Sequence, residues 1–415
     1  MWDSFRFFLF FLFVAIVELY FYQAVKGFVS NFNPKTKNVV FTIEYLLMAF
    51  NIIIPLIGMF YSPTKWPDWF RFVSSIALIL LVCKLLGCAF LILDDFYRGI
   101  RWIYQLITST GVDVNGQAVK ISRIKFFSQL AVGFAVVPAI GFVYGIIRGA
   151  YKYRVHHAKV KSNKLPADFN GFKIVQISDI HTGSFFNSNA LEHAFDIVMQ
   201  QKADIILFTG DLVNNRADET EGFENVYSKL NAPHGVFSVL GNHDYGDYVQ
   251  WSEGEKEKNL EKLKEIQKKC GWRLLMNEHI AIERGNSKIA LLGIENWGGK
   301  GHFPKYGKMN LAHADTEEYP FKILMSHDPS HWDMQVIKDY KDIDLTLSGH
   351  THGMQFGIEI PNLKWSPVKF LYKNWAGLYK DGEQYLYVNR GLGFLGYPGR
   401  LGIWPEITVI ELQSA

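Results

Sequence analysis

Five short motifs between residues 179 and 353 carry side chains of the types that bind metal ions. Two of them separate their donors by two positions, which places both side chains on one face of an extended backbone. Glycines adjoin most of the motifs, at points where a side chain would hinder tight turns and close approach of the backbone. In order, the motifs are Asp179-Ile180-His181, Gly210-Asp211, Gly241-Asn242-His243-Asp244, Ser326-His327-Asp328 and Gly349-His350-Thr351-His352-Gly353.

The number of donors in these motifs predicts a site for two divalent metal ions. A tetrahedral zinc ion takes four ligands, whereas two ions that share a bridging carboxylate use the larger set present in this chain. The donors are nitrogen and oxygen with no thiolate, a set that suits Mn, Fe, Zn or Mg and does not choose among them. The candidate donors are Asp179, His181, Asp211, Asn242, His327, His350 and His352.

The motifs follow short β-rich runs, which indicates that strands position them. Helical patterns at 190–200 and 255–269 lie between the early runs, and strands that alternate with helices predict a layered α/β domain. Ligands in open α/β sheets gather at the carboxyl ends of the strands, where these motifs fall. The expected strands cover residues 173–178, 204–209, 236–240, 289–294, 322–326 and 343–348.

The ordered motifs resemble those of the calcineurin-like metallophosphoesterase superfamily, and the resemblance covers about residues 170–415. It implies a four-layer α/β/β/α sandwich, in which two sheets pack face to face with helices outside. It further implies two ligand sets that share Asp211 as a bridge: Asp179, His181, Asp211 and His352 for one metal, and Asp211, Asn242, His327 and His350 for the other.

The chemistry expected at such a site is metal-dependent hydrolysis of a phosphoester without a covalent enzyme intermediate. His243 follows the ligand Asn242 and is not itself expected on a metal, so we expect it to protonate the leaving oxygen. Asp244 is expected to orient the His243 ring or tune its basicity. Both are therefore candidate catalytic residues of an enzyme.

The first 150 residues differ sharply in composition from the rest. They hold 13 basic and 7 acidic side chains, against 30 and 33 in residues 151–415, although the whole chain has a formal charge of only +3. That near-neutral total gives no indication of a nucleic-acid partner. Crossing a bilayer takes about 20 apolar residues of helix. Four stretches of the chain meet that length, at 5–25, 39–60, 70–93 and 126–147.

Three charged residues interrupt the predicted spans: Glu18, Glu44 and Lys84. A charge that faces lipid is costly, so these side chains should face one another, a cavity or the interface. They fit either a polar pathway or lipid-headgroup site, or an interhelical ion pair, and we favour the ion pair.

Basic residues are densest directly after the fourth span. Such clusters stay on the cytoplasmic side, beside anionic lipids. We therefore expect an integral protein of the plasma (inner) membrane with a cytoplasmic catalytic domain. The expected organisation is a four-helix transmembrane region over 1–150, a basic juxtamembrane linker over 151–170 and a metallophosphoesterase domain over 171–415. The cluster comprises Arg148, Lys152, Arg154, Lys159, Lys161 and Lys164.

Several spans before such a domain are similar to the transmembrane metallophosphoesterase branch, some of whose relatives are linked to hydrolysis of UDP-2,3-diacylglucosamine. The leading hypothesis is a membrane-bound phosphohydrolase that cleaves a phosphodiester, phosphomonoester or pyrophosphate bond in a lipid-linked substrate. The expected partners are then membrane lipids and that phosphorylated substrate. One alternative is a tethered phosphodiesterase or phosphatase for a soluble substrate. Another is a transport or sensor protein that uses the domain as a binding module.

Two features after the last motif could contact the substrate. The segment 361–379 interleaves aromatic residues with lysines, which fits either an interfacial flap or ordinary packing over the sheet. Arg390 and Arg400 are further candidates for phosphate contacts.

Overall fold

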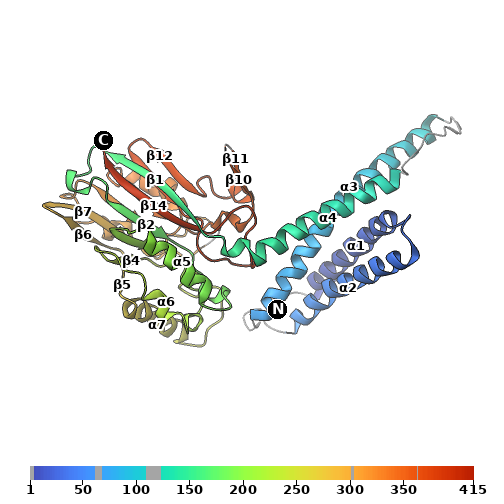
Figure 1. Cartoon of the computed structure of the whole chain (residues 1–415), viewed down its shortest axis with the longest axis horizontal. Coiled ribbons are helices and arrows are strands. Elements are labelled where there is room, and N and C mark those ends of the chain that lie inside the picture. Colours follow the sequence, from blue (N-terminus) through green and yellow to red (C-terminus); the bar gives the residue numbers. More distant parts are fainter. Residues whose placement is uncertain (1–3, 61–67, 109–122, 301–302, 362) are drawn as a thin grey trace. The chain divides into compact units, whose positions relative to one another are not determined.

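The chain forms two compact units, Met1–Tyr144 and Gly145–Ala415, in a computed structural model (Figure 1). The structure describes residues 4–60, 68–108, 123–300, 303–361 and 363–415. The first unit is helical, and the end of its last helix belongs to the second unit. The helices are α1 (Ser4–Phe28), α2 (Pro34–Met59), α3 (Asp68–Thr108) and α4 (Arg123–Ile147).

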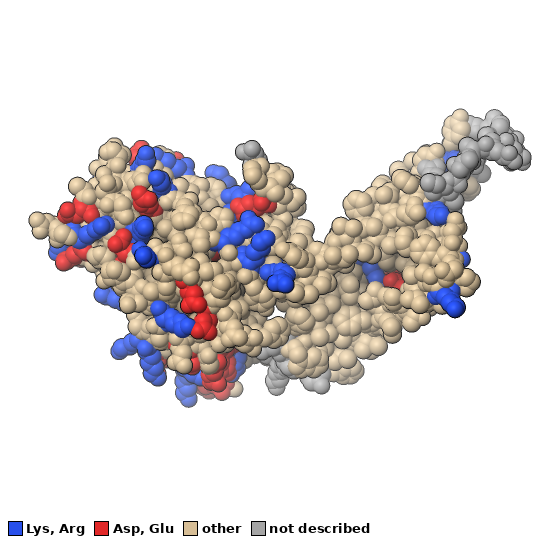
Figure 2. All heavy atoms as spheres, in the orientation of Figure 1, with Lys and Arg blue, Asp and Glu red and all other residues tan. Residues whose placement is uncertain are grey.

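All four helices are long and apolar enough to cross a membrane, in agreement with the predicted spans. In Figure 2 the visible face of these helices is mostly uncharged, whereas charged side chains are spread over the second unit. Helix α3 continues well past the predicted end at residue 93. Its 41 residues extend about 60 Å at 1.5 Å per residue, which exceeds the ~30 Å hydrocarbon core.

The charged residues within the spans pair with one another. The Lys84 Nζ lies 2.6 Å from the Glu18 Oε2 and 2.9 Å from the Glu44 Oε1, which joins α1, α2 and α3. The Asn51 side chain donates a hydrogen bond of 2.7 Å to the other Glu18 oxygen. All four side chains are buried. The interpretation as an interhelical ion pair is therefore confirmed.

Two six-stranded sheets form the centre of the second unit. The first has the order β1-β14-β2-β3-β4-β5, with β14 antiparallel to β2 and its other neighbouring strands parallel. Its strands are β1 (Arg154–Ser162), β2 (Lys173–Ile177), β3 (Ile205–Phe208), β4 (Val236–Ser238), β5 (Trp272–Leu274) and β14 (Glu406–Ser414).

The second sheet has the order β12-β13-β9-β8-β7-β6, with parallel pairing in its centre and an antiparallel strand at each edge. Its strands are β6 (Glu278–Arg284), β7 (Ser287–Gly293), β8 (Lys322–Met325), β9 (Leu345–Ser348), β12 (Gly377–Asp381) and β13 (Gln384–Val388). A separate two-stranded hairpin consists of β10 (Ile358–Ile360) and β11 (Leu363–Trp365).

The apolar core is arranged in layers. Buried side chains of both sheets, such as Leu207 and Leu345, pack together in one cluster between them. A second cluster joins the first sheet to its helices, and a third joins the second sheet to a helical layer on its other face. The expected four-layer α/β/β/α sandwich is thus confirmed. Its helices are α5 (Asn189–Gln200), α6 (Glu224–Tyr227), α7 (Glu255–Lys269), α8 (Met309–His313) and α9 (Ile337–Asp339).

Residues 151–170 are not the simple linker that the sequence suggested. Nine of them form β1, which pairs along its whole length with β14 at the other end of the domain. Lys159 and Lys161 point to solvent while Val160 is buried, so the basic residues occupy the outer face of an edge strand. The folded domain therefore begins before residue 171.

Candidate metal centre

The five motifs converge at the carboxyl ends of parallel strands from both sheets. Asp179, Asp211 and Asn242 follow β2, β3 and β4, while the motifs with His327 and His350 follow β8 and β9. Apart from the exposed Lys173 at the start of β2, these strands are buried runs of mostly apolar residues, which fixes the ends from which the donors project. Residues separated by up to 171 positions in sequence are thereby brought into hydrogen-bonding distance.

The predicted donors form two compact groups, one for each expected ion. The first contains Asp179, His181 and His352, and the second contains Asp211, His327 and His350. Within each group the ligand atoms lie within 4.8 Å of one another. The two Nε2 atoms of His181 and His352 are 3.1 Å apart, so two imidazole nitrogens point at the same small volume.

Asn242 joins the second group through its amide oxygen. That oxygen lies 2.8 Å from the His350 Nδ1 and 3.2 Å from the His327 Nε2. Asp211 lies between the groups, because its Oδ2 is 3.1 Å from the His327 Nε2 and 3.6 Å from the His181 Nε2. All seven predicted donors therefore lie together, and the nitrogen and oxygen set fits divalent metal ions.

The backbone is left-handed at five of the seven donor positions. Only a few per cent of non-glycine residues adopt positive φ, and such residues cluster at functional sites. Here φ is between 49° and 72° at Asp179, His181, Asp211, His350 and His352. This concentration of strained backbone supports a functional site, and it is evidence separate from the sequences of the motifs.

Two glycines permit the close approach of the ligand loops. Gly210 has φ of 96°, and a Cβ there would lie 2.5 Å from the backbone nitrogen of Gly241. A Cβ at Gly349 would lie 2.2 Å from the Asp179 carboxylate. Neither position accommodates a side chain without moving a donor.

Each histidine donor is oriented by a partner on its other ring nitrogen, as is usual for metal-binding histidines. The His181 Nδ1 is 3.1 Å from the Asn214 Oδ1, and the His327 Nδ1 is 2.7 Å from the Thr209 carbonyl oxygen. The sequence reasoning did not identify Asn214 or Thr209, because neither belongs to a motif. The other two partners are Tyr372 for His350 and Arg400 for His352.

The titratable groups of the site shift one another's pKa values. Burial alone would raise the pKa of Asp211, but the neighbouring His327 and His243 hold it well below its ordinary value. Burial would lower the pKa of His327, yet the Asp211 carboxylate outweighs burial and raises it to about 10. Burial lowers the pKa of His181 to about 3 despite the nearby Asp211 carboxylate, so the His181 ring is neutral and can act as a ligand.

His243 adjoins the metal-binding groups without belonging to either. Its ring Nδ1 lies 2.7 Å from the Asn214 carbonyl oxygen, and its ring centre is 5.0 Å from that of His181. Its backbone nitrogen donates to the Asp211 Oδ1 at 2.9 Å. The ring is half-buried, and Tyr248 packs against it at 4.7 Å between centres.

Asp244 occupies a different position from the one predicted. Its carboxylate is fully buried and accepts hydrogen bonds from the backbone nitrogens of Asp211, Leu212 and Gly241, all at 2.8–2.9 Å. The backbone nitrogen of Val213 also donates to this carboxylate. These hydrogen bonds all come from the backbone, and none comes from the His243 ring. Asn214 holds that ring, and Asp244 instead braces the two loops that carry Asp211 and Asn242.

Arg390 and Arg400 are not positioned to contact substrate. Arg390 is buried and pairs with Glu406 and Glu359. Arg400 is fully buried, and its guanidinium donates to the Arg390 and Gly393 carbonyl oxygens. Their expected role in phosphate binding is therefore corrected to a structural one.

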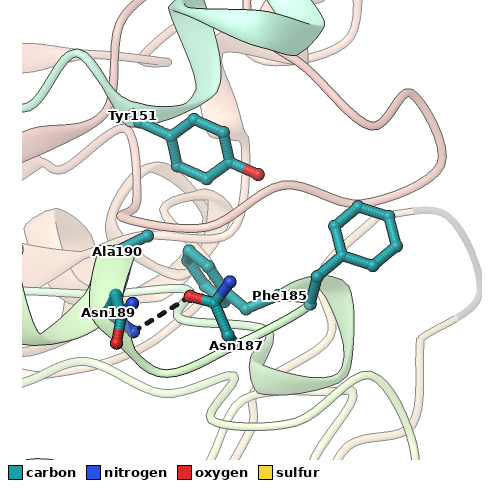
Figure 3. Close-up of a pocket in the computed structure, with 6 residues that line it drawn as sticks. Tyr151, Phe185, Asn187, Asn189 and Ala190 are labelled. Carbon is teal, nitrogen blue, oxygen red and sulfur yellow. Dashed lines mark hydrogen bonds between the residues drawn. The ribbon is translucent and has the colours of Figure 1, made fainter.

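A separate pocket of about 420 Å³ lies beside the start of α5. Figure 3 shows Tyr151, Phe185 and Asn187 around it. None of the predicted donors lines this pocket, although Phe185 follows the short turn that begins after His181. The pocket is thus distinct from the cluster of donors.

Comparison with known proteins matches both parts of the chain. Residues 5–150 match the family described as probable calcineurin-like phosphoesterase, transmembrane domain, and residues 172–354 match calcineurin-like phosphoesterase. The uncharacterized metallophosphoesterase YkuE of Bacillus subtilis is 30% identical over 71% of this chain and 99% of its own length. The phosphodiesterase YaeI of Escherichia coli is 29% identical over 70% of this chain and 99% of its own length.

A relative from a vertebrate is also named as a transmembrane protein. The transmembrane protein with metallophosphoesterase domain of Danio rerio is 29% identical over 68% of this chain, and the match spans 62% of that protein. The resemblance inferred from the motifs is confirmed. The chain therefore belongs to the calcineurin-like metallophosphoesterase family and is a membrane-associated, metal-dependent phosphoesterase.

Proposed function

We propose that this protein is a dinuclear phosphohydrolase that cleaves a phosphodiester, phosphomonoester or pyrophosphate bond in a lipid-linked substrate. The observation that carries the two-metal proposal is the place of the Asp211 Oδ2, which lies within 3.6 Å of histidine nitrogens from both donor groups. A single ion would leave one of these groups without a role.

The ligand assignment is part of the proposal. Asp179, His181 and His352 would hold one ion, and Asn242, His327 and His350 the other, with Asp211 shared. When bound, two divalent ions supply charge neutralisation at phosphorus and a water of lowered pKa. The chain itself must supply the proton for the leaving oxygen.

His243 is the proposed proton donor. The Asn214 carbonyl accepts from the His243 Nδ1, which leaves the Nε2 for a proton that can pass to the leaving group. Asn214 also contacts the His181 ring, so one residue sets the spacing between the proton donor and the first metal group.

The proposal of a lipid-linked substrate rests on the four candidate spans in the same chain. UDP-2,3-diacylglucosamine is one candidate, and its hydrolysis would release UMP and a lipid monophosphate. We further propose that the catalytic domain lies on the cytoplasmic side of the plasma (inner) membrane, because the basic residues of 148–164 suit anionic lipids.

Hydrolysis of bis(p-nitrophenyl) phosphate by the purified full-length protein tests the chemistry. We expect activity that depends on added divalent metal and is lost in an Asp211→Asn variant. Asp196 lies on the exposed face of α5, so Asp196→Asn is the matched control and should behave as the native protein. Equal, negligible rates for both variants and the native protein with saturating metal would favour a binding module.

The substrate class needs a second measurement. Release of UMP or a lipid monophosphate from candidate lipids in mixed micelles is expected under the proposal. Rapid hydrolysis of cyclic nucleotides or phosphoproteins, with no turnover of any lipid, would favour the tethered enzyme for a soluble substrate.

A further inference from the structure

The β10–β11 hairpin has its amphipathic faces reversed. A strand of a soluble protein turns its apolar side chains toward the core. In β10, however, Ile358 and Ile360 are 46% and 58% exposed, while Glu359 between them pairs with the buried Arg390. On β11, Lys364 lies opposite Glu359 and bonds the backbone oxygen of Ala376. The charged side chains face the protein and the apolar ones face outward.

Further exposed apolar residues occur on β11 and shortly after the hairpin in the sequence. Leu363 is 48% exposed, Phe370 76% and Leu371 59%. We call Ile358, Ile360, Leu363, Phe370 and Leu371 the apolar flap. Elsewhere in the described part of the catalytic domain, exposed large apolar side chains are well separated in sequence, as at Leu311 on α8. Five exposed large apolar side chains within 14 residues of the chain are typical of an interaction site.

Arg400 and Leu401 join the root of the apolar flap to Gly145, the first residue of the second unit. The backbone nitrogen of Arg400 donates to the Gly145 carbonyl oxygen, near the end of α4, at 3.1 Å. The next residue, Leu401, bonds Gln355 and Gly357, directly before β10. Arg400 and Leu401 therefore lie between Gly145 and the residues that precede β10. The candidate span Lys125–Tyr151 runs through Gly145, so the root of the flap contacts the segment of chain at which that span ends.

The apolar flap is also joined to the candidate metal centre. The Tyr372 hydroxyl, one residue beyond the flap, lies 2.8 Å from the His350 Nε2. The Thr351 hydroxyl, within the last motif, donates to the Trp375 carbonyl oxygen at 2.7 Å. Beneath the exposed residues, Val368, Tyr372 and Trp375 form a small buried cluster. The flap is thus a fixed extension of the ligand loop.

We propose that the apolar flap inserts into the interfacial layer of the bilayer that holds the chain's own spans, and that it thereby sets the metal centre at the height of membrane phosphoryl groups. Apolar side chains beside basic ones are typical of interfacial segments, and Lys369 and Lys373 flank Phe370 and Leu371. The assignment of membrane phosphoryl groups as targets rests on the proposed function, whereas the insertion itself does not.

A fluorescent probe on the full-length protein in phosphatidylcholine nanodiscs tests the insertion. The three native cysteines are buried, so an introduced cysteine labels selectively. The probe is placed by Lys369→Cys in the flap, and by Lys258→Cys on the exposed face of α7 as the matched control. We expect lipids carrying a doxyl quencher near the headgroup to quench the flap probe several-fold more than the control, and aqueous iodide to do the reverse.

A second variant separates insertion from mere proximity to the tether. In the Lys369→Cys background, Phe370→Ser with Leu371→Ser should reduce quenching by the doxyl lipid to the control level, with the melting temperature retained. Equal quenching at both probe positions, or full quenching in the serine variant, would overturn the proposal. Because the readout needs no turnover, a failure of the proposed hydrolysis leaves this result unaffected.

Discussion

The strongest test of the proposed chemistry is the replacement of His243. Its ring is held by the Asn214 carbonyl at 2.7 Å, and its backbone nitrogen is hydrogen-bonded to Asp211. The side chain belongs to neither donor group. A His243→Gln variant keeps the backbone contact and a similar volume but loses a group that can carry and release a proton near neutral pH.

The expected loss follows from general acid catalysis. A positioned acid contributes about 10²–10⁴-fold to the rate, which corresponds to about 2.7–5.5 kcal/mol of activation free energy. The loss should depend on the leaving group, because an acidic phenol leaves readily as its anion and needs little protonation. In a series of aryl phosphodiesters, we expect the ratio of native to variant kcat to grow as the leaving phenol becomes less acidic. The metal content of the variant should stay unchanged.

Two results would refute this reasoning. An equal loss for every leaving group would mean that the ring does not donate the proton. Loss of bound metal together with activity would mean that His243 supports the ligands instead. His157 lies exposed on β1, so His157→Gln is the matched control and should retain native kcat for the whole series.

Further predictions concern metal binding, loop bracing and the spans. Because the His327 pKa is raised to about 10 by the Asp211 carboxylate against the effect of burial, the metal-free site holds a proton there at neutral pH. Metal affinity should therefore fall about tenfold for each unit of decrease in pH between 9 and 7. Calorimetry in buffers of different ionisation enthalpy would detect the proton that metal binding releases. An affinity that does not change with pH would contradict the assignment. Asp244→Asn replaces one acceptor oxygen by a donor that faces backbone N–H groups, so thermal melting should show a loss of about 1–3 kcal/mol, and undiminished stability would argue against bracing. Lys84→Met leaves two buried carboxylates without their cation and should destabilise the protein by about 3–5 kcal/mol in a detergent melt, whereas a neutral effect would mean that the pair is dispensable for packing.

Most of the donor set could be predicted from sequence because its members follow buried strands. A strand that is buried on both faces reads as a continuous apolar run, and Ile205–Phe208 and Ile323–Met325 show this without any knowledge of pairing. The residue that follows such a run lies at the carboxyl end of a strand. Because parallel strands end on the same side of a sheet, the motifs that follow them bring their donors to that side.

Contacts between distant loops could not be predicted in this way. Asn214 orients two histidines, but the path of the loop after Asp211 decides this, and nothing in its spacing distinguishes it from an ordinary loop asparagine. Strand β1 was missed for a related reason. Its partner β14 lies about 250 residues away, and five of its nine residues are Arg, His or Lys, so locally it resembles a basic linker.

The strained backbone of the site has a free-energy cost that the rest of the domain must offset. A left-handed conformation costs roughly 1–2 kcal/mol for a residue with a side chain, so five donors in that conformation cost about 5–10 kcal/mol together. This approaches the whole net stability of a typical domain, about 5–15 kcal/mol. Burial of Leu207, Leu345 and their neighbours between the two sheets must offset it. Packing between the two sheets therefore stabilises the donor loops against this strain.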